Sequence, residues 1–270
     1  MSGRPWHVRL IGKLFSFRFF FARLTRLPLI GKAADSLFFK GDSIIYLPRD
    51  IVVEVNRPIA PQDNMPLPSE VVEHFVGISK HRMIMNECIC RSSAGCKDYP
   101  VDYGCLFLGE AVLRIDPALG RRVTAEEALD YLKKCRDAGL VHLIGKNKLD
   151  AVWLNAGPAD KLLTICNCCP CCCLWKILPD LEGPIGSKVT KMPGLDIRVG
   201  DDCTGCGKCT RGACFVDAIK VVDGKAVIGD ECRGCGRCAD VCPAKAIEVR
   251  IDSDSLQRSI DQIAAVVDVA

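Results

Sequence analysis

Two copies of one cysteine pattern constrain the C-terminal third of this chain more than any other feature of its sequence. The first copy has the spacing C-x2-C-x2-C-x4-C, and the second has the spacing C-x2-C-x2-C-x3-C followed by proline. The eight cysteines are Cys203, Cys206, Cys209 and Cys214 in the first copy, and Cys232, Cys235, Cys238 and Cys242 in the second. Glycines such as Gly205 and Gly234 lie between them and permit tight loops. Each copy can therefore wrap three sulfur atoms around one centre.

This spacing predicts metal binding by thiolates. A cubane [4Fe-4S] cluster needs four thiolates, and a run of three cysteines with a fourth farther along supplies them. A zinc ribbon is the alternative, but it uses two C-x-x-C pairs per ion and does not explain two runs of three. Most of the 19 cysteines lie in such short-spaced runs, which favour metal binding over disulfide bonds. We therefore expect a reducing cytoplasm. The sequence therefore predicts two [4Fe-4S] clusters in this region.

Residues 203–249 resemble a bacterial-type dicluster ferredoxin, and an Ala-Ile pair follows each cysteine run, at Ala218 and at Ala246. In that family the fourth cysteine of each run binds the other cluster. The resemblance implies that one cluster is held by Cys203, Cys206, Cys209 and Cys242, and the other by Cys232, Cys235, Cys238 and Cys214. The first copy departs from the family pattern, since it has one extra residue before Cys214 and Phe215 in place of proline. We expect a change of loop shape there.

Ten further cysteines lie upstream in two groups, and neither group has a ferredoxin spacing. They are Cys88, Cys90, Cys96 and Cys105, and then Cys166, Cys168, Cys169, Cys171, Cys172 and Cys173. Alternate residues of an extended chain face the same way, so Cys166 and Cys168 can reach one centre while their neighbours point elsewhere. We expect a subset to hold one more iron-sulfur cluster shared between the two groups. Zinc is the first alternative, and a larger or open-site cluster is the second.

The succession from Glu87 through the cysteines at 166–173 is similar to iron-sulfur proteins of anaerobic bacteria and archaea that place such a region ahead of a dicluster ferredoxin. The resemblance covers about residues 70–250 and implies electron transfer. Arg91 and His142 are candidates for supporting positions beside the metal, although a lone histidine among apolar residues is more often structural. Cys135 falls on the apolar face of an expected helix, which favours a core position.

The expected fold class is α+β, with a ferredoxin-like dicluster domain at the C-terminus. A helix is expected from Ser69 to about Lys80, and a second follows a capping box at Thr124 and Glu127. Short strands are expected at residues 140–144, 152–154 and 162–165, which gives a helix-and-hairpin outline like that of a winged helix. The predicted divisions are residues 1–57, 69–178 for the cysteine-rich α+β domain, 196–250 for the ferredoxin domain and 254–270 for a C-terminal helix, with a proline-rich linker at 58–68.

The N-terminal segment predicts a basic amphipathic helix. Its apolar stripe comprises Leu10, Leu14, Phe17, Phe21 and Leu24, at helical spacing, and we expect the helix to end at Pro28. Residues 8–26 could lie on an anionic membrane surface or dock with a partner helix, or could pack on their own domain. Residues 1–34 carry seven Lys or Arg and no acid, whereas the whole chain has a net charge of +3. The net positive charge is thus concentrated in the first segment, and the chain has no general basic surface of the kind that binds nucleic acid, so we expect no nucleic-acid partner. We expect a cytoplasmic protein, peripheral on the inner face of the membrane if it binds lipid.

The leading functional hypothesis is an electron carrier or redox subunit of an oxidoreductase complex, which exchanges electrons with redox partner proteins. The alternative is an enzyme that reduces a small substrate at an open-site cluster held by the upstream cysteines. A third hypothesis, a redox-sensing regulator, requires a basic recognition helix, and residues 125–138 mix acids and bases instead. The sequence has no glycine-rich nucleotide motif, so flavin or nicotinamide would reside on a partner.

Overall fold

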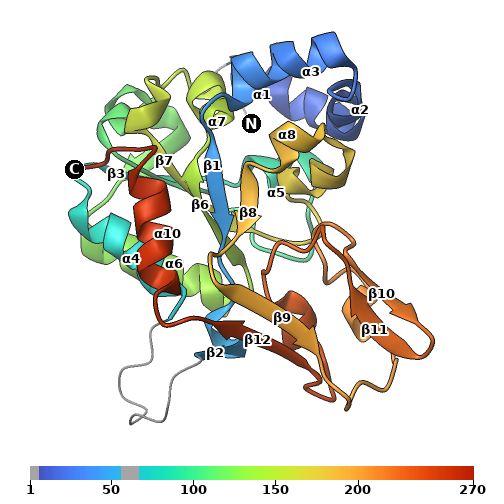
Figure 1. Ribbon diagram of the computed structural model, residues 1–270. Helices are drawn as coiled ribbons and strands as arrows, with labels where there is room; N and C mark the ends of the chain where they lie inside the picture. Colours follow the sequence, from blue (N-terminus) through green and yellow to red (C-terminus); the bar gives the residue numbers. More distant parts are fainter. Residues whose placement is uncertain (1–5, 56–66) are drawn as a thin grey trace.

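The computed structural model describes residues 6–55 and 67–270 and is built around a seven-stranded sheet (Figure 1). The strand order is β5-β3-β4-β7-β6-β1-β8. These strands are β1 (Ser43–Tyr46), β3 (Arg82–Met85), β4 (Leu106–Leu108), β5 (Gly120–Arg122), β6 (Val141–Lys146), β7 (Leu163–Cys168) and β8 (Val189–Lys191). Neighbours run antiparallel except for β1 and β8, which are parallel. The long apolar runs in β6 and β7 suit the centre of such a sheet, since both of its faces are covered.

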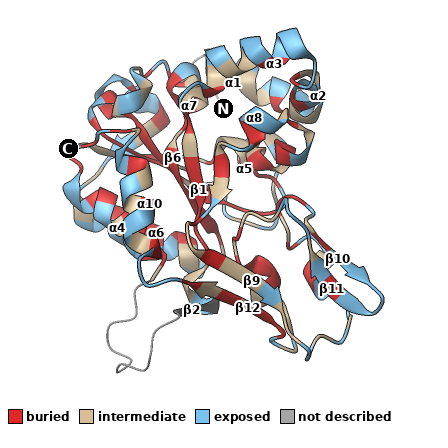
Figure 2. Cartoon of the chain, viewed as in Figure 1, coloured by how far each residue is buried: buried red, intermediate tan, exposed pale blue. Residues whose placement is uncertain are grey.

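Helices cover both faces of this sheet. The α-helices are α1 (Trp6–Leu14), α2 (Arg18–Leu24), α3 (Pro28–Ala34), α4 (Ser69–Ile78), α5 (Ile89–Ala94), α6 (Ala125–Asp137), α7 (Lys148–Trp153), α8 (Gly183–Gly186), α9 (Arg237–Asp240) and α10 (Ser255–Ala264). On one face, Ile45 and Ile144 pack in a core with α4, α6 and α10. On the other face, Ile44 and Leu143 pack with Ala22 of α2 and with the segment after β7. Figure 2 shows the central strands as the buried layer between these helices.

The C-terminal cysteine pattern lies in a smaller unit beside the sheet, low in Figure 1. Its three-stranded sheet has the order β2 (Val53–Val55), β12 (Ile247–Ile251) and β9 (Leu195–Val199), with β2 parallel and β9 antiparallel to β12. A separate hairpin joins β10 (Ile219–Val222) to β11 (Lys225–Ile228). The N-terminal segment thus contributes β1 to the large sheet and β2 to the small one. The chain is a mixed α/β protein.

Several sequence-based expectations are confirmed. The capping box of α6 forms, since Thr124 Oγ1 accepts a hydrogen bond from the Glu127 N–H at 3.2 Å and Glu127 Oε2 accepts one from the Thr124 N–H at 2.8 Å. Helix α4 begins at Ser69 as expected. Helix α10 packs back on α4 and on strands β1 and β6. Strands β6 and β7 contain most of the apolar runs at 140–144 and 162–165.

Two local expectations are wrong. Residues 152–154 are not a strand, because α7 runs to Trp153, and the buried Asp150 accepts hydrogen bonds from Asn147 Nδ2 and Trp153 Nε1 that hold this helix closed. Strand β6 therefore pairs with β7 and β1 inside the large sheet, and the winged-helix interpretation is not confirmed. The N-terminal stripe is broken by a 3-10 turn at Phe15–Phe17, and Pro28 begins α3 instead of ending a helix. Residues 58–66 of the expected linker lie outside the described part of the chain, as do residues 1–5 and 56–57 of the predicted N-terminal division.

Within the described residues, no helix combines the length and the apolar character that crossing a bilayer requires.

Candidate metal centres

The first three cysteines of the first copy face the last cysteine of the second. Cys203, Cys206, Cys209 and Cys242 line one small cavity together with Pro243. Gly205 and Gly207 have φ angles of +64° and +71°, which L side chains rarely adopt, and so permit the tight loop. The N–H of Ala226 donates to Cys203 Sγ at 3.3 Å. Burial raises the pKa of Cys209, and the nearby charges of Cys242, Cys203 and Cys206 raise it further.

The second set is formed by Cys232, Cys235 and Cys238 with Cys214. Burial raises the pKa of Cys235 to about 12, and the charges of Cys214 and Cys232 act in the same direction, so these sulfur atoms lie close together. The N–H of Ala218 donates to Cys214 Sγ at 3.3 Å, which mirrors the bond between Ala226 and Cys203. Backbone N–H groups that point at thiolates are what an anionic iron-sulfur cluster requires. Both sets therefore fit such a cluster in residue type and surroundings.

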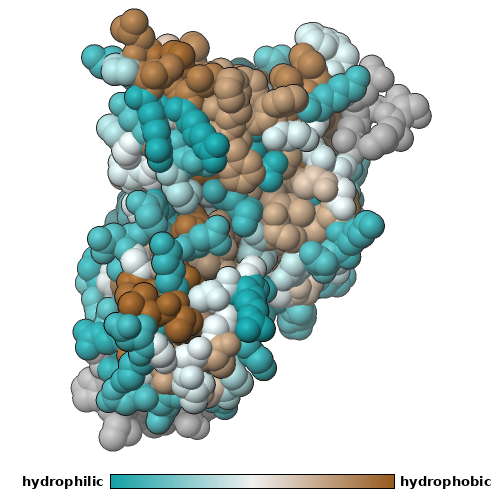
Figure 3. Space-filling model, turned by 90° about the vertical axis from the view of Figure 1, so that its right-hand side faces the viewer, coloured by the Kyte–Doolittle hydropathy of each residue, from teal (hydrophilic) through white to brown (hydrophobic). Residues whose placement is uncertain are grey.

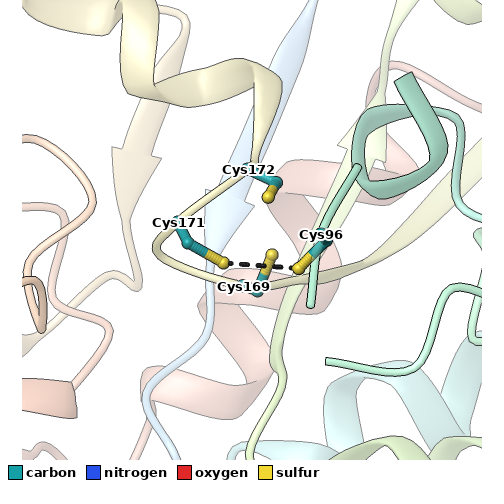
Figure 4. Close-up of side chains that lie close together, drawn as sticks. All are labelled: Cys96, Cys169, Cys171 and Cys172. Carbon is teal, nitrogen blue, oxygen red and sulfur yellow. Dashed lines mark hydrogen bonds between the residues drawn. The ribbon is translucent and has the colours of Figure 1, made fainter. Parts of the chain in front are cut away.

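Four of the ten upstream cysteines form a compact group, which we call the four-cysteine site. Its members are Cys96, Cys169, Cys171 and Cys172, whose Sγ atoms all lie within 4.8 Å of one another (Figure 4). Cys96 follows α5 after Gly95, which ends that helix at a φ of +62°, and the other three lie on the loop after β7. The Sγ atoms of Cys96 and Cys171 are 3.6 Å apart. Four thiolates around one zinc ion, with bonds of about 2.3 Å, would lie roughly 3.8 Å apart. The spacing thus suits a single ion.

The other six form a second group, which we call the six-cysteine site: Cys88, Cys90, Cys105, Cys166, Cys168 and Cys173. All six line a cavity of about 860 Å³, which Cys169 of the four-cysteine site also lines. Strand register brings Cys105 to Cys166, because Leu106 of β4 pairs with Ile165 of β7, and their Sγ atoms are 3.7 Å apart. The Sγ atoms of Cys168 and Cys173 are 3.2 Å apart. A hydrogen bond from Cys90 lowers the pKa of Cys88 to about 7.

Arg91 ties together the three segments that carry these cysteines. Its side chain is fully buried, and it donates hydrogen bonds to the carbonyl of Asn167, at 2.8 Å, and to the carbonyl of Tyr103. Asn167 lies between Cys166 and Cys168, and Asn167 Nδ2 also donates to the Gly104 carbonyl at 2.7 Å. Burial lowers the pKa of Arg91, but nearby cysteine charge outweighs burial and raises it above its usual value. Arg91 therefore has the supporting role that the sequence predicts, since its buried positive charge and hydrogen bonds hold the cysteine segments together.

Two tyrosines, one fully buried and one partly buried, lie between the upstream sites and the C-terminal cysteines. Tyr46 is fully buried, and its ring packs edge-to-face on Phe215 at 5.5 Å. Burial raises the pKa of Tyr46, and the charges of Cys173 and Cys235 contribute, so its hydroxyl lies near both the six-cysteine site and the C-terminal cysteines. The sequence does not single this tyrosine out.

The second aromatic residue is Tyr99, whose hydroxyl accepts a hydrogen bond from Arg237 at 3.0 Å. Arg237 precedes Cys238 in the chain. Burial raises the pKa of Tyr99, and the charges of Cys171 and Cys169 act on it as well, so its hydroxyl lies near the four-cysteine site. Both upstream sites therefore approach the same C-terminal cysteine set.

His142 and Cys135 lie in other surroundings. His142 lines a separate pocket beside Leu47 and Arg136, and burial lowers its pKa to about 3. Cys135 is fully buried in the core on α6, and burial raises its pKa to about 12. Both positions agree with structural roles.

Comparison with known proteins identifies one segment. Residues 226–248 match a family model described as a 4Fe-4S binding domain (Fer4). No curated protein and no solved structure matches the chain. The matched segment contains the second run, from Cys232 to Cys242. The C-terminal unit of this chain thus carries a 4Fe-4S binding domain.

Proposed function

We propose that this protein relays electrons through two [4Fe-4S] clusters in its C-terminal unit. One cluster would be held by Cys203, Cys206, Cys209 and Cys242, and the other by Cys232, Cys235, Cys238 and Cys214. The observation that carries the proposal is the crossed arrangement, in which each run of three meets the fourth cysteine of the other run. Crossed ligation is what bacterial dicluster ferredoxins use.

The exposure of the two cysteine sets suggests the order in which electrons would pass through the clusters. Each set contains one buried cysteine, but Cys206 of the first set is exposed whereas no cysteine of the second set is, so the first cluster would lie nearer to the surface. A redox partner protein would exchange electrons at the exposed cluster. The buried cluster would pass them toward the upstream sites, close to Tyr46 and Tyr99. Buried, apolar surroundings around the route limit water access and help to set the reduction potentials.

The four-cysteine site would hold a third metal centre. Its short sulfur separations favour one zinc or iron ion over a cubane, because each cubane thiolate binds a different iron and must stand farther from its neighbours. The sequence predicted one cluster shared between the two upstream groups of cysteines. We propose two separate sites instead, because the ten cysteines divide into a group of four and a group of six.

The test is anaerobic iron and sulfide analysis with electron paramagnetic resonance of the reduced protein. Wild type should contain at least about eight irons in two interacting [4Fe-4S] clusters. Cys209→Ser should alter the signal of one cluster and Cys235→Ser the signal of the other. Cys135→Ser is the matched control, because that thiol lies in the core of α6, and it should leave both signals unchanged. Identical spectra in all three variants would contradict the ligand assignment.

We also propose that the N-terminal helices dock on an anionic membrane surface. Figure 3 shows hydrophobic residues gathered near the top of the molecule, over these helices. The exposed fractions are 71% for Trp6, 57% for Phe20 and 85% for Leu29, and cationic side chains flank them. Exposed apolar patches of this kind mark interaction surfaces, and cations favour anionic lipid.

Vesicle flotation tests this docking. Wild type should float with vesicles containing phosphatidylserine, and Leu29→Glu should reduce the floating fraction severalfold. Leu129→Glu is the control, since Leu129 is exposed on α6. No flotation of wild type would exclude the lipid surface and leave a partner protein's groove as the occupant.

A second candidate function is reduction of a small substrate at an upstream cluster. One observation favours it: the six-cysteine site faces a cavity of about 860 Å³, within the usual range for small-molecule pockets.

A further inference from the structure

The six-cysteine site is separate from the four-cysteine site, although both draw on the same short segment. Strand β7 ends at Cys168, and both Cys166 and Cys168 line the cavity. Cys169 also lines it, but its Sγ groups with those of Cys96, Cys171 and Cys172. Cys173 returns to the cavity side, where it contacts Cys168. Cys96, Cys171 and Cys172 are not among the residues that line the cavity, so the two sites differ in most of their thiols.

The sulfur atoms of the six-cysteine site form a connected set. Cys105 and Cys168 both hydrogen bond to Cys166, and Cys168 contacts Cys173. Cys90 and Cys88 form a further pair, and the charges of Cys173 and Cys166 act on Cys90. A single tetrahedral ion takes four thiolates, and a cubane also takes four. Six thiols around one cavity exceed either requirement.

Cations flank these sulfur atoms, as an anionic cluster requires. Arg91 lies among them with its side chain fully buried, and the charge of Cys88 acts on it. Arg18 of α2 also lines the cavity, and its guanidinium lies over the rings of Phe15 and Phe19 at 4.3 and 4.5 Å. The charges of Cys90, Cys172 and Cys173 act on Arg18, so it lies near the six-cysteine site and near one thiol of the four-cysteine site. An anionic cluster held by these thiolates would therefore lie between the positive charges of Arg91 and Arg18.

The cavity extends well beyond the sulfur atoms as an apolar chamber. Its walls come from the N-terminal helices, α7 and the segment after β7, and all three tryptophans of the chain line it: Trp6, Trp153 and Trp175. Four buried polar atoms of chamber residues have no hydrogen-bond partner among the described residues: Arg18 Nε, Arg91 Nε, Asn147 Oδ1 and Asn167 Oδ1. Two of them are acceptors, and of these Asn167 lies between two cysteines of the site whereas Asn147 precedes α7. An apolar cavity with few polar groups beside a redox centre is the usual form of a small-molecule site.

We propose that Cys88, Cys90, Cys105, Cys166, Cys168 and Cys173 bind a polynuclear iron-sulfur cluster of their own, and that the chamber beside it takes a small apolar ring with one hydrogen-bond donor. The donor would face Asn147. This inference deepens the proposed electron relay, because electrons would reach the cluster from the buried C-terminal set near Tyr46. Its ligands are distinct from those of the C-terminal clusters, so the two proposals can fail separately.

The metal test compares two double variants. Cys105→Ser/Cys166→Ser removes two thiols of the six-cysteine site, and Cys96→Ser/Cys171→Ser removes two thiols of the four-cysteine site that do not line the cavity. Iron, acid-labile sulfide and zinc are measured per chain under anaerobic conditions, with paramagnetic resonance spectra. The first variant should lose about four irons together with sulfide, and the second should lose one metal ion and no sulfide.

Unchanged iron and sulfide in the first variant would overturn the six-cysteine cluster. Loss of the same metal in both variants would also overturn it, since that would mean one shared centre. Retained signals from the C-terminal clusters show that each variant is folded. Absence of those signals from wild type would instead refute the proposed electron relay.

The chamber test uses 1-naphthol, an apolar ring with one hydroxyl, titrated into the metal-loaded protein and followed by calorimetry. Ala34 lines the chamber, so Ala34→Phe should fill part of it and weaken binding at least tenfold. Ala33→Phe is the matched control, since Ala33 is exposed on the same helix, and it should bind as wild type does. Equal binding by all three proteins, or none by wild type, would overturn this part of the proposal.

Discussion

Replacing Arg91 by methionine should destabilise the protein by several kcal/mol. The Arg91 side chain is fully buried and donates to two carbonyls, those of Asn167 and Tyr103, which belong to different cysteine segments. Hydrogen bonds from a charged donor contribute about 1.5–3 kcal/mol each, and Arg91 makes two of them. We therefore expect a loss of about 3–5 kcal/mol, a large part of the roughly 5–15 kcal/mol that stabilises a domain.

Anaerobic urea unfolding followed by circular dichroism measures this loss. With a slope of about 3 kcal/mol per molar urea, the midpoint should fall by about 1–2 M. Arg91→Lys keeps the charge but lacks the planar fork that reaches two carbonyls, so it should lose about half as much. Arg122→Met is the control, because Arg122 is exposed on β5. If both Arg91 variants unfold within about 0.5 kcal/mol of wild type, the bridging role is wrong.

Three further outcomes follow from individual contacts. Thr124→Ala removes the side-chain cap of α6 and should cost about 1 kcal/mol in thermal or urea unfolding; no loss would contradict the cap. Burial raises the pKa of Asp150 to about 7, above its value in an unfolded chain, so stability should fall as pH rises from about 4 to 7, and Asp150→Asn should reduce that slope in a pH series of urea midpoints. The Tyr46 hydroxyl has no hydrogen-bond partner within the described chain, so Tyr46→Phe should leave the melting temperature of the metal-free protein unchanged or higher, and a clear decrease would reveal a bond that the hydroxyl makes.

Helices and strands whose signals lie within a few consecutive residues could be predicted from the sequence. The capping box at Thr124 and the apolar run of β7 each depend on a few consecutive residues, and both formed as expected. The strand expected at 152–154 failed because contacts outside its own residues decided it, since Asp150 accepts hydrogen bonds from both Asn147 and Thr164 and so stabilises a helical turn. Apolar periodicity alone does not distinguish a short strand from a short buried helix.

The break in the N-terminal stripe has a similar cause. The apolar spacing is helical throughout, but α1 and α2 pack against different parts of the molecule, α1 near α5 and α2 near the segment after β7. A 3-10 turn between them changes the direction of the chain. Sequence periodicity records the apolar face but not the point at which the helix must bend to follow its partners.

The sequence by itself determined the chemistry of this protein, and the tertiary structure decided how that chemistry is divided. Short spacing sets the directions of sulfur atoms within one loop, which is why the repeated runs alone predicted iron-sulfur binding. The upstream sites combine residues far apart in the chain, such as Cys105 with Cys166 and Cys96 with Cys171. Their meeting depends on the pairing of β4 with β7 and on the bridge made by Arg91, and spacing along the chain records neither of these.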